Sequence, residues 1–128
     1  MRLLLLVGTG SFIGGVGRYL LSTFIQAKTP SGFPYGTLMV NLLGCLLIGV
    51  LFGLFERTEV TTETRLLLVT GVLGGFTTFS AFSGETFNLI RAGHFTIALT
   101  YVLISVVAGV ILTFAGAWIV KTSIPGGN

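Results

Sequence analysis

Four long apolar stretches alternate with short polar segments along the chain. They cover about 3–25, 33–55, 66–90 and 95–120, and each reaches the roughly 20 residues that an α-helix needs to cross a bilayer. Together they occupy nearly all of residues 1–128 and leave no room for a soluble domain. The pattern predicts one all-α integral membrane domain with four transmembrane helices.

The third apolar stretch contains a polar interruption that a lipid-facing helix would not carry. Residues 74–80 read Gly-Gly-Phe-Thr-Thr-Phe-Ser, and Glu85 follows within two turns. Paired glycines loosen the backbone, and hydroxyl side chains compete for its hydrogen bonds. Irregular backbone is tolerated at membrane depth only where protein buries it or a watery cavity meets it. We therefore expect the third helix to be broken between Gly74 and Ser80, facing a polar space.

The composition supports a membrane protein. Charged residues make up 9% of the chain, compared with roughly 25% in an average soluble domain. The net charge of +3 comes from residues that flank the helices, and nothing in it indicates binding to nucleic acid. The one histidine, His94, and the one cysteine, Cys45, belong to no ligand cluster or catalytic triad, so we do not expect an enzyme.

Nineteen glycines indicate close packing between helices. Lipid chains are as apolar as the helices, so close approach of the backbones supplies much of the energy of helix association. Three glycine pairs lie about one turn apart on a helix: Gly10 and Gly14, Gly49 and Gly53, and Gly71 and Gly75. We expect these faces to pack tightly within the chain and between chains, although any single pair could be ordinary helix filler.

The basic residues give the bundle almost no preferred orientation. The N-terminus, residues 56–65 and the C-terminus fall on one side of the membrane. This side carries four cations, Arg2, Arg57, Arg65 and Lys121. The opposite side carries three, Arg18, Lys28 and Arg91. Lysine and arginine near the helix ends set orientation, whereas acids contribute little. So small a bias predicts dual topology, in which chains insert both ways and pair as an antiparallel homodimer.

Several polar side chains fall inside the predicted spans. Asn41 could donate a hydrogen bond to an anion through its NH₂ group, or it could simply bond to another helix. Tyr101 and Ser105, four residues apart, share one helix face, where they form a short ladder of hydroxyl groups or merely pack. Glu85 is an intramembrane acid and hence a functional candidate, with pairing to a cation such as Arg91 or capping of a polar pocket as alternatives.

An aromatic stripe crosses the interrupted segment. Phe76, Phe79 and Phe82 recur every three residues and would stack along one helical face, with threonine and serine between them. Such a stripe is ordinarily apolar packing. The edge of an aromatic ring carries partial positive charge, however, so rings presented edge-on could line an anion path without a fixed cation that would trap the ion.

Two motifs resemble those of the Fluc (CrcB-type) fluoride channels. Residues 36–44 read Gly-Thr-Leu-x-x-Asn-Leu-x-Gly, and residues 74–85 read Gly-Gly-Phe-Thr-Thr-Phe-Ser-x-Phe-Ser-x-Glu. The chain length, the four spans, the glycine-rich first span with Arg18, and the pair Tyr101 and Ser105 also fit this family. The resemblance implies a multi-pass antiparallel homodimer in the inner (plasma) membrane of a prokaryote.

The resemblance also implies a function. Family members let fluoride leave the cytoplasm passively, down its gradient, and so relieve the toxicity of fluoride that enters as the membrane-permeant acid. Phe79 and Phe82 would present their ring edges to dehydrated fluoride, while Asn41 would donate a hydrogen bond on the same path. Thr78 and Ser80 would belong to the polar lining.

Further roles follow from the same resemblance. Tyr101 and Ser105 would continue the polar track from the rings. Arg18 would lie near a vestibule, where its charge could raise the local anion concentration. The backbone carbonyls of Gly74 and Thr77 from both subunits would surround one structural sodium ion (Na⁺) at the dimer centre, because carbonyl oxygens suit a hard cation.

A proton-coupled transporter of the small multidrug type is the alternative. It would share the four helices, the similar length and the antiparallel dimer. Its mechanism needs a membrane-embedded carboxylate in the first helix to exchange protons for drug, and residues 3–25 contain no Asp or Glu. Glu85 in the third span does not replace that group, so the sequence favours the channel.

Overall fold

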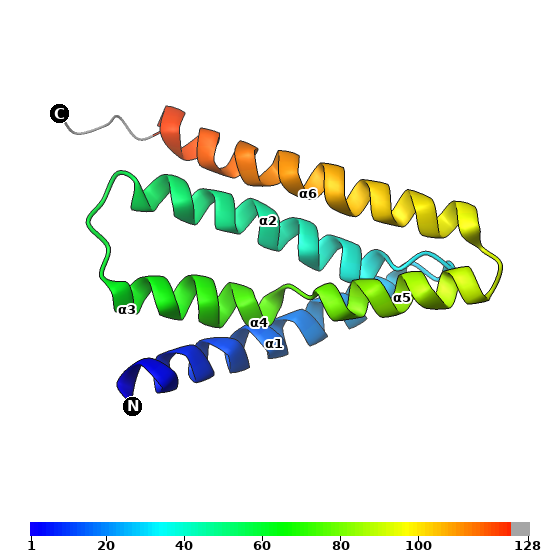
Figure 1. The fold of residues 1–128 in the computed structure, drawn as a ribbon, viewed down its shortest axis with the longest axis horizontal. Helices are drawn as coiled ribbons and strands as arrows, with labels where there is room; N and C mark the ends of the chain where they lie inside the picture. The colour runs from blue at the N-terminus through cyan, green and yellow to red at the C-terminus, as the bar shows by residue number, and fades with distance from the viewer. Residues whose placement is uncertain (124–128) are drawn as a thin grey trace.

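A computed structural model describes residues 1–123, which form four helices long and apolar enough to cross a membrane (Figure 1). They are α1 (Arg2–Lys28), α2 (Tyr35–Phe55), a divided third span (Thr62–Arg91) and α6 (Phe95–Ser123). The four spans predicted from the hydropathy pattern are therefore confirmed. Residues 124–128, the last five of the predicted domain, lie outside the described residues.

The third span is built from shorter helical pieces. They are α3 (Thr62–Arg65), the π-helix η1 (Leu66–Leu73), α4 (Gly74–Phe76) and α5 (Phe79–Arg91). Between α4 and α5 the backbone is extended at Thr77 and Thr78, with ψ angles of 155° and 117°. The break predicted between Gly74 and Ser80 is thus confirmed. The paired glycines remain helical, and the two threonines interrupt the helix.

The break allows the third span to change its packing partner. Before the break, η1 and α4 pack on α1, and after it α5 packs on α6. The helix α2 contacts η1, α4 and α5 and also lies along α6. A straight helix over the 30 residues of this span would follow a single direction, so the change of neighbour depends on the extended residues in its middle.

Facing glycines hold α1 against the first half of the third span. Gly10 faces Gly71, while Gly14 lies against the backbone of Val72 and Phe76, and Gly75 lies against the backbone of Ser11. A Cβ atom added at Gly10 would lie 2.7 Å from the carbonyl oxygen of Leu67 and 2.9 Å from the Cα of Gly71. Any side chain there would force the two backbones apart, because real Cβ atoms do not come so close. The close packing predicted for these two pairs within the chain is confirmed.

Glycines also join α2 to α6. Gly49 lies against the backbone of Thr113, and a Cβ atom added at Gly53 would lie 3.0 Å from the carbonyl oxygen of Ala117. The hydroxyl of Thr113 donates a hydrogen bond across the interface to the carbonyl oxygen of Cys45, at 3.1 Å. Close backbone approach thus comes with a polar contact, as is common between helices in lipid.

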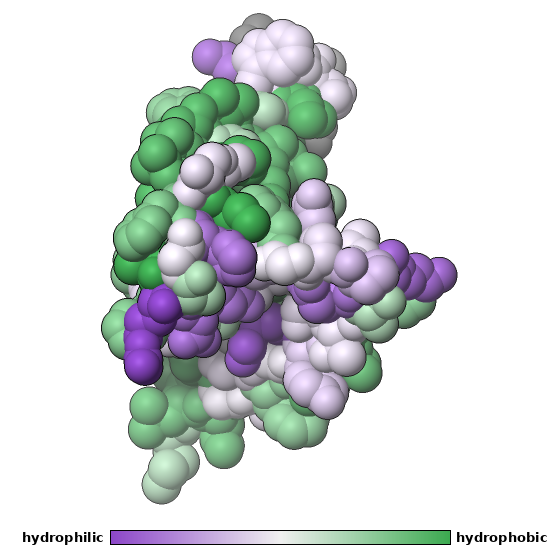
Figure 2. All heavy atoms as spheres, turned by 90° about the vertical axis from the view of Figure 1, so that its right-hand side faces the viewer, coloured by the Kyte–Doolittle hydropathy of each residue, from purple (hydrophilic) through white to green (hydrophobic). Residues whose placement is uncertain are grey.

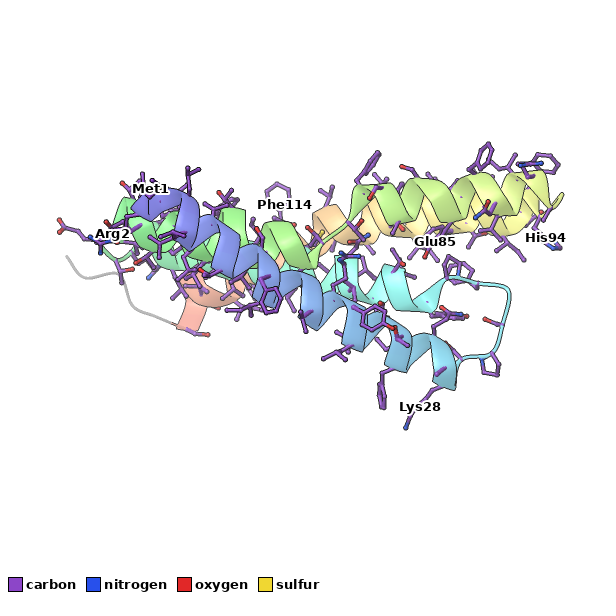
Figure 3. The ribbon with its side chains drawn as sticks, turned by 90° about the horizontal axis from the view of Figure 1, so that it is seen from below. Met1, Arg2, Lys28, Glu85, His94 and Phe114 are labelled. Carbon is purple, nitrogen blue, oxygen red and sulfur yellow. The ribbon has the colours of Figure 1, made fainter. Side chains whose placement is uncertain are left out.

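The two ends of the bundle differ from its flanks. Met1 and Arg2 lie at one end, and Lys28 and His94 lie at the other (Figure 3). Polar side chains gather on the latter end, which faces the viewer in Figure 2. Large apolar side chains are exposed along the helices, as expected for a surface in contact with lipid. The homodimer and insertion in both orientations stay predictions.

Gly10→Ala should destabilise the protein, because its methyl group would meet the backbone of the third span. Overpacking of this kind costs about 1–3 kcal/mol, which should lower the midpoint of thermal unfolding in detergent, followed by circular dichroism. Gly8→Ala is the matched control: it lies on the same helix, and nothing lies within 4 Å of the added Cβ atom. Equal midpoints for both variants would contradict the packing described here.

Candidate ion pathway at the helix break

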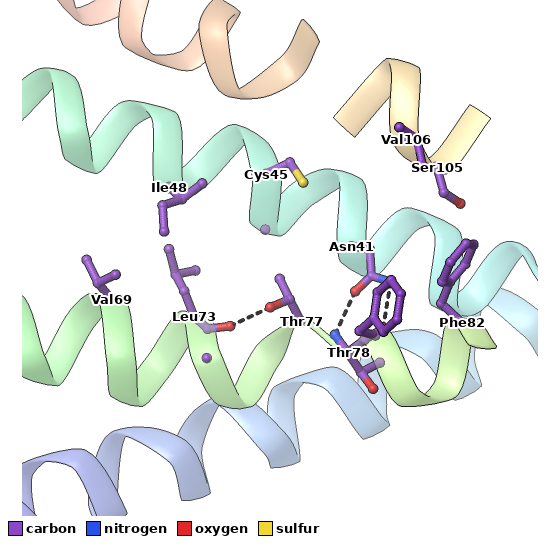
Figure 4. Close-up of a pocket in the computed structure, with 13 residues that line it drawn as sticks. Asn41, Cys45, Ile48, Val69, Leu73, Thr77, Thr78, Phe82, Ser105 and Val106 are labelled. Atoms are coloured by element: carbon purple, nitrogen blue, oxygen red, sulfur yellow. Dashed lines mark hydrogen bonds between the residues drawn. The ribbon is translucent and has the colours of Figure 1, made fainter. Parts of the chain in front are cut away.

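Asn41 joins α2 to the break in the third span (Figure 4). Its Oδ1 accepts a hydrogen bond from the backbone N–H of Thr78 at 2.8 Å, and its Nδ2 donates to the carbonyl oxygen of Thr78 at 3.0 Å. One amide therefore satisfies both backbone groups of an extended residue at membrane depth. The second N–H of Nδ2 donates to no other group within residues 1–123, so it remains available to a ligand.

The break redirects backbone donors that a continuous helix would give to carbonyl groups four residues earlier. The N–H of Thr78, which would serve Gly74, donates to Asn41 instead. The N–H of Ala81, which would serve Thr77, donates to the hydroxyl of Thr78 at 3.2 Å and so caps α5. The carbonyl groups of Gly74 and Thr77 thus lose their helical donors, which leaves their oxygens suited to a cation.

Arg18 serves another carbonyl group at the break. Its Nε donates to the carbonyl oxygen of Gly75 at 3.2 Å. The residue lies ten positions before Lys28 at the end of α1, which is about 15 Å along a helix. Arg18, which the sequence analysis counts among the cations at the far end of the first span, therefore lies well inside its helix. The guanidinium of Arg18 lies at the level of the break, where the carbonyl group of Gly75 accepts its hydrogen bond.

A pocket of about 370 Å³ opens beside the break, between α2, the third span and α6 (Figure 4). It brings together most of the residues predicted for the ion path and the sodium site: Asn41, Gly74, Thr77, Thr78, Phe79, Phe82 and Ser105. Ser80, Tyr101 and Arg18 do not line it. Its wall is mostly apolar with a few convergent polar groups, which is the usual character of a small-ligand site.

Two aromatic rings stand at the pocket. The ring centroids of Phe79 and Phe82 are 5.5 Å apart, with the ring planes inclined by 51°. The ring of Phe82 also meets that of Tyr101 edge to face at 5.1 Å, which fixes its orientation. Phe79 is 78% exposed in the single chain. One ring is thus held by its neighbours and the other projects from the chain.

Phe76 does not belong to this aromatic pair. It precedes the break, with its ring 3.6 Å from the position of a Cβ atom added at Gly44 and 3.8 Å from one added at Gly17. The expectation of one helical stripe that includes Phe76 is wrong, because the extended residues Thr77 and Thr78 separate α4 from α5. Helical spacing in the sequence cannot place residues on one face across such a break.

The hydroxyl groups near the pocket have different partners. Tyr101 is fully buried and donates to Oε2 of Glu85 at 2.7 Å. The buried hydroxyl of Ser105 lines the pocket and has no hydrogen-bond partner among the described residues, which costs about 1–3 kcal/mol unless a ligand or water supplies one. The hydroxyl of Ser80 lies 3.2 Å from that of Thr78. The predicted ladder of Tyr101 and Ser105 is therefore divided between two sites.

Glu85 is held by hydroxyl groups. Thr37 donates to its Oε1 at 2.6 Å and Tyr101 to its Oε2 at 2.7 Å, so the acid bridges α2 and α6. Arg91, the cation considered from the sequence, lies instead over an aromatic ring of its own helix. Thr37 was not among the predicted site residues, although its position four residues before Asn41 places both polar groups on one face of α2.

Known proteins resemble the chain along almost its entire length. The family model described as "CrcB-like protein, Camphor Resistance (CrcB)" matches residues 5–117. A fluoride-specific ion channel FluC from Phocaeicola vulgatus is 43% identical over 118 residues, which are 92% of this chain and 98% of the relative. A protein of the same name from Pseudomonas fluorescens is 45% identical over 120 residues, 93% of this chain and 97% of the relative. The chain therefore belongs to the CrcB-like family, together with these FluC proteins.

Proposed function

We propose that the chain forms a fluoride-selective channel through which fluoride leaves the cytoplasm passively, down its electrochemical gradient. It thereby relieves the toxicity of fluoride that enters the cell as the uncharged acid. The channel lies in the inner (plasma) membrane of a prokaryote. The observation that carries the proposal is the pocket at the helix break, where an amide N–H, an unpartnered hydroxyl and two aromatic rings converge, in a chain similar to proteins named fluoride-specific ion channels.

The available donors suit a small, strongly hydrated anion. A selective path must replace the water contacts of fluoride and exclude larger anions by its width. Asn41 has one uncommitted N–H and Ser105 an unpartnered hydroxyl. The hydroxyl groups of Thr78 and Ser80 lie 3.2 Å from each other at the start of α5. These neutral donors attract an anion without the strong trapping of a fixed cation.

The aromatic rings supply further favourable contacts to the fluoride ion. The edges of Phe79 and Phe82 carry partial positive charge, and Arg18 contributes a full charge at the level of the break. Tyr101 donates its one O–H to Glu85, so its contribution is to orient the ring of Phe82, which it meets at 5.1 Å. Tyr101 thus acts beside the anion path through its neighbours.

The functional unit is an antiparallel homodimer with a structural sodium ion at its centre. The carbonyl oxygens of Gly74 and Thr77 have lost their helical donors, and oxygens of this kind fit a hard cation. A two-fold axis would present the same pair from each copy to one ion. The partner chain would also cover Phe79, which is 78% exposed in the single chain.

Fluoride efflux from liposomes that contain the purified protein tests this function. With potassium inside and valinomycin to carry it out as the balancing charge, a fluoride-sensitive electrode should record rapid efflux down the gradient, without a pH gradient, while chloride remains inside. Empty liposomes provide the background. Chloride efflux at a comparable rate would contradict a selective channel, and efflux that requires a proton gradient would favour the proton-coupled transporter.

Phe79→Ile and Phe82→Ile keep an apolar bulk and remove the ring edge. We expect each to slow fluoride efflux by roughly tenfold, which corresponds to about 1.4 kcal/mol at the barrier. Phe87→Ile is the matched control, because Phe87 lies on the same helix, is 58% exposed and does not line the pocket. Unchanged efflux in both path variants would mean that the rings only pack.

Replacement of sodium by N-methylglucamine on both sides of the membrane should abolish fluoride efflux, and readdition of sodium should restore it. Thr77→Ser should keep this dependence, because the ion is bound by the backbone carbonyl and the remaining hydroxyl can still donate to Leu73, as Thr77 does at 3.0 Å. Efflux that persists without sodium would remove the ion from the proposal but leave fluoride conduction intact.

A further inference from the structure

A second pocket lies between the C-terminal ends of α2 and α6, away from the helix break. Its volume is about 440 Å³, and its base is formed where Gly53 of α2 faces Ala117 of α6. In Figure 1 these helix ends lie at the same end of the bundle as the N-terminus. The pocket is therefore at a membrane–water boundary, where lipid head groups meet the protein.

One wall of this pocket is a stripe along α6. Phe114, Trp118 and Lys121 follow at intervals of four and three residues, which places them on one helix face. Phe114 is 74% exposed and Trp118 65% exposed, and Figure 3 shows Phe114 projecting beyond the ribbons. Tryptophan prefers the interface between hydrocarbon and head groups. The stripe thus leads from an apolar surface for an acyl chain to a charge at the head-group level.

The polar part of the pocket contains charges of both signs. Arg57 donates through Nη2 to the carbonyl oxygen of Lys121 at 3.1 Å and so ties the two helix ends together. The ammonium group of Lys121 and the carboxylate of Glu56 have no hydrogen-bond or ion-pair partner within residues 1–123, and they do not pair with each other. The pocket therefore offers an unpaired cation and an unpaired acid beside a fixed arginine.

We propose that this pocket binds the head group of phosphatidylethanolamine. The lipid phosphate lies at Lys121, within the positive field of Arg57, and the lipid ammonium lies at Glu56. An acyl chain follows Phe114 and Trp118 into the membrane. Phosphatidylglycerol would meet the same cations but bring no ammonium for Glu56, so the acid makes the site selective between two lipids that share a phosphate.

Native mass spectrometry of the full chain in detergent, with equal amounts of the two lipids, measures this selectivity. We expect phosphatidylethanolamine to be retained about fivefold more than phosphatidylglycerol, the effect of one charge contact at the head-group level. Equal retention of the two lipids, or preference for phosphatidylglycerol, would overturn the proposal. Fluoride conduction is not involved, so the outcome is independent of the proposed channel function.

Two variants locate the selectivity. Glu56→Gln should bring the retention ratio of the two lipids close to one, and Lys121→Gln should lower the retention of both by about fivefold. Glu63→Gln is the matched acidic control, because Glu63 pairs with Arg2 at 3.3 Å outside the pocket. Lys28→Gln at the opposite end is the basic control.

The controls decide between a pocket and a general charge effect. Both should retain the two lipids as the unaltered protein does. The proposal fails if Glu56→Gln preserves the preference for phosphatidylethanolamine, or if Lys28→Gln weakens retention as much as Lys121→Gln. Equal thermal unfolding midpoints for all four variants show that the differences in retention come from the replaced charge.

Discussion

A peptide group without hydrogen-bond partners costs several kcal/mol at membrane depth. The fold of this chain depends on how the peptide groups of Thr78 obtain such partners. Asn41 provides both the acceptor and the donor that the extended backbone needs. Because Asn41 makes these two hydrogen bonds, the third span can lose its helical hydrogen bonds for two residues. Its second half can then leave α1 and pack on α6, which opens the pocket beside the break.

The same two residues create the chemistry of the site. The N–H groups of Thr78 and Ala81 donate to side chains and so leave the carbonyl oxygens of Gly74 and Thr77 without their helical donors. The carbonyl oxygen of Gly75, between them, accepts from Arg18. The break therefore concentrates polar groups of both kinds in an otherwise apolar bundle. The uncommitted N–H of Asn41 and the hydroxyl of Ser105 lie on α2 and α6, whereas the carbonyl oxygens that lack helical donors lie on the third span.

Sequence reasoning succeeds here where a property is local. Span lengths follow from continuous hydropathy, the break from small and hydroxyl residues, and the facing glycine pairs from their spacing. Sequence reasoning fails where a contact joins residues that are far apart in the sequence. The spacing of Phe76 and Phe79 assumes a continuous helix, which Thr77 and Thr78 interrupt. The partners of Glu85 and Arg18 depend on which helices become neighbours, and the mostly apolar residues of η1 carry no signal that distinguishes a π-helix from an α-helix.

The hydrogen bond from Arg18 to Gly75 also constrains how the protein is made. The two residues are 57 positions apart, and at synthesis rates of about 5–20 residues per second the acceptor follows the donor by several seconds. Throughout that interval the first helix holds an arginine whose eventual partner does not yet exist. The guanidinium must reach toward water or lipid phosphate until the third helix arrives. Final placement of α1 therefore waits for the third span, which follows it in the chain.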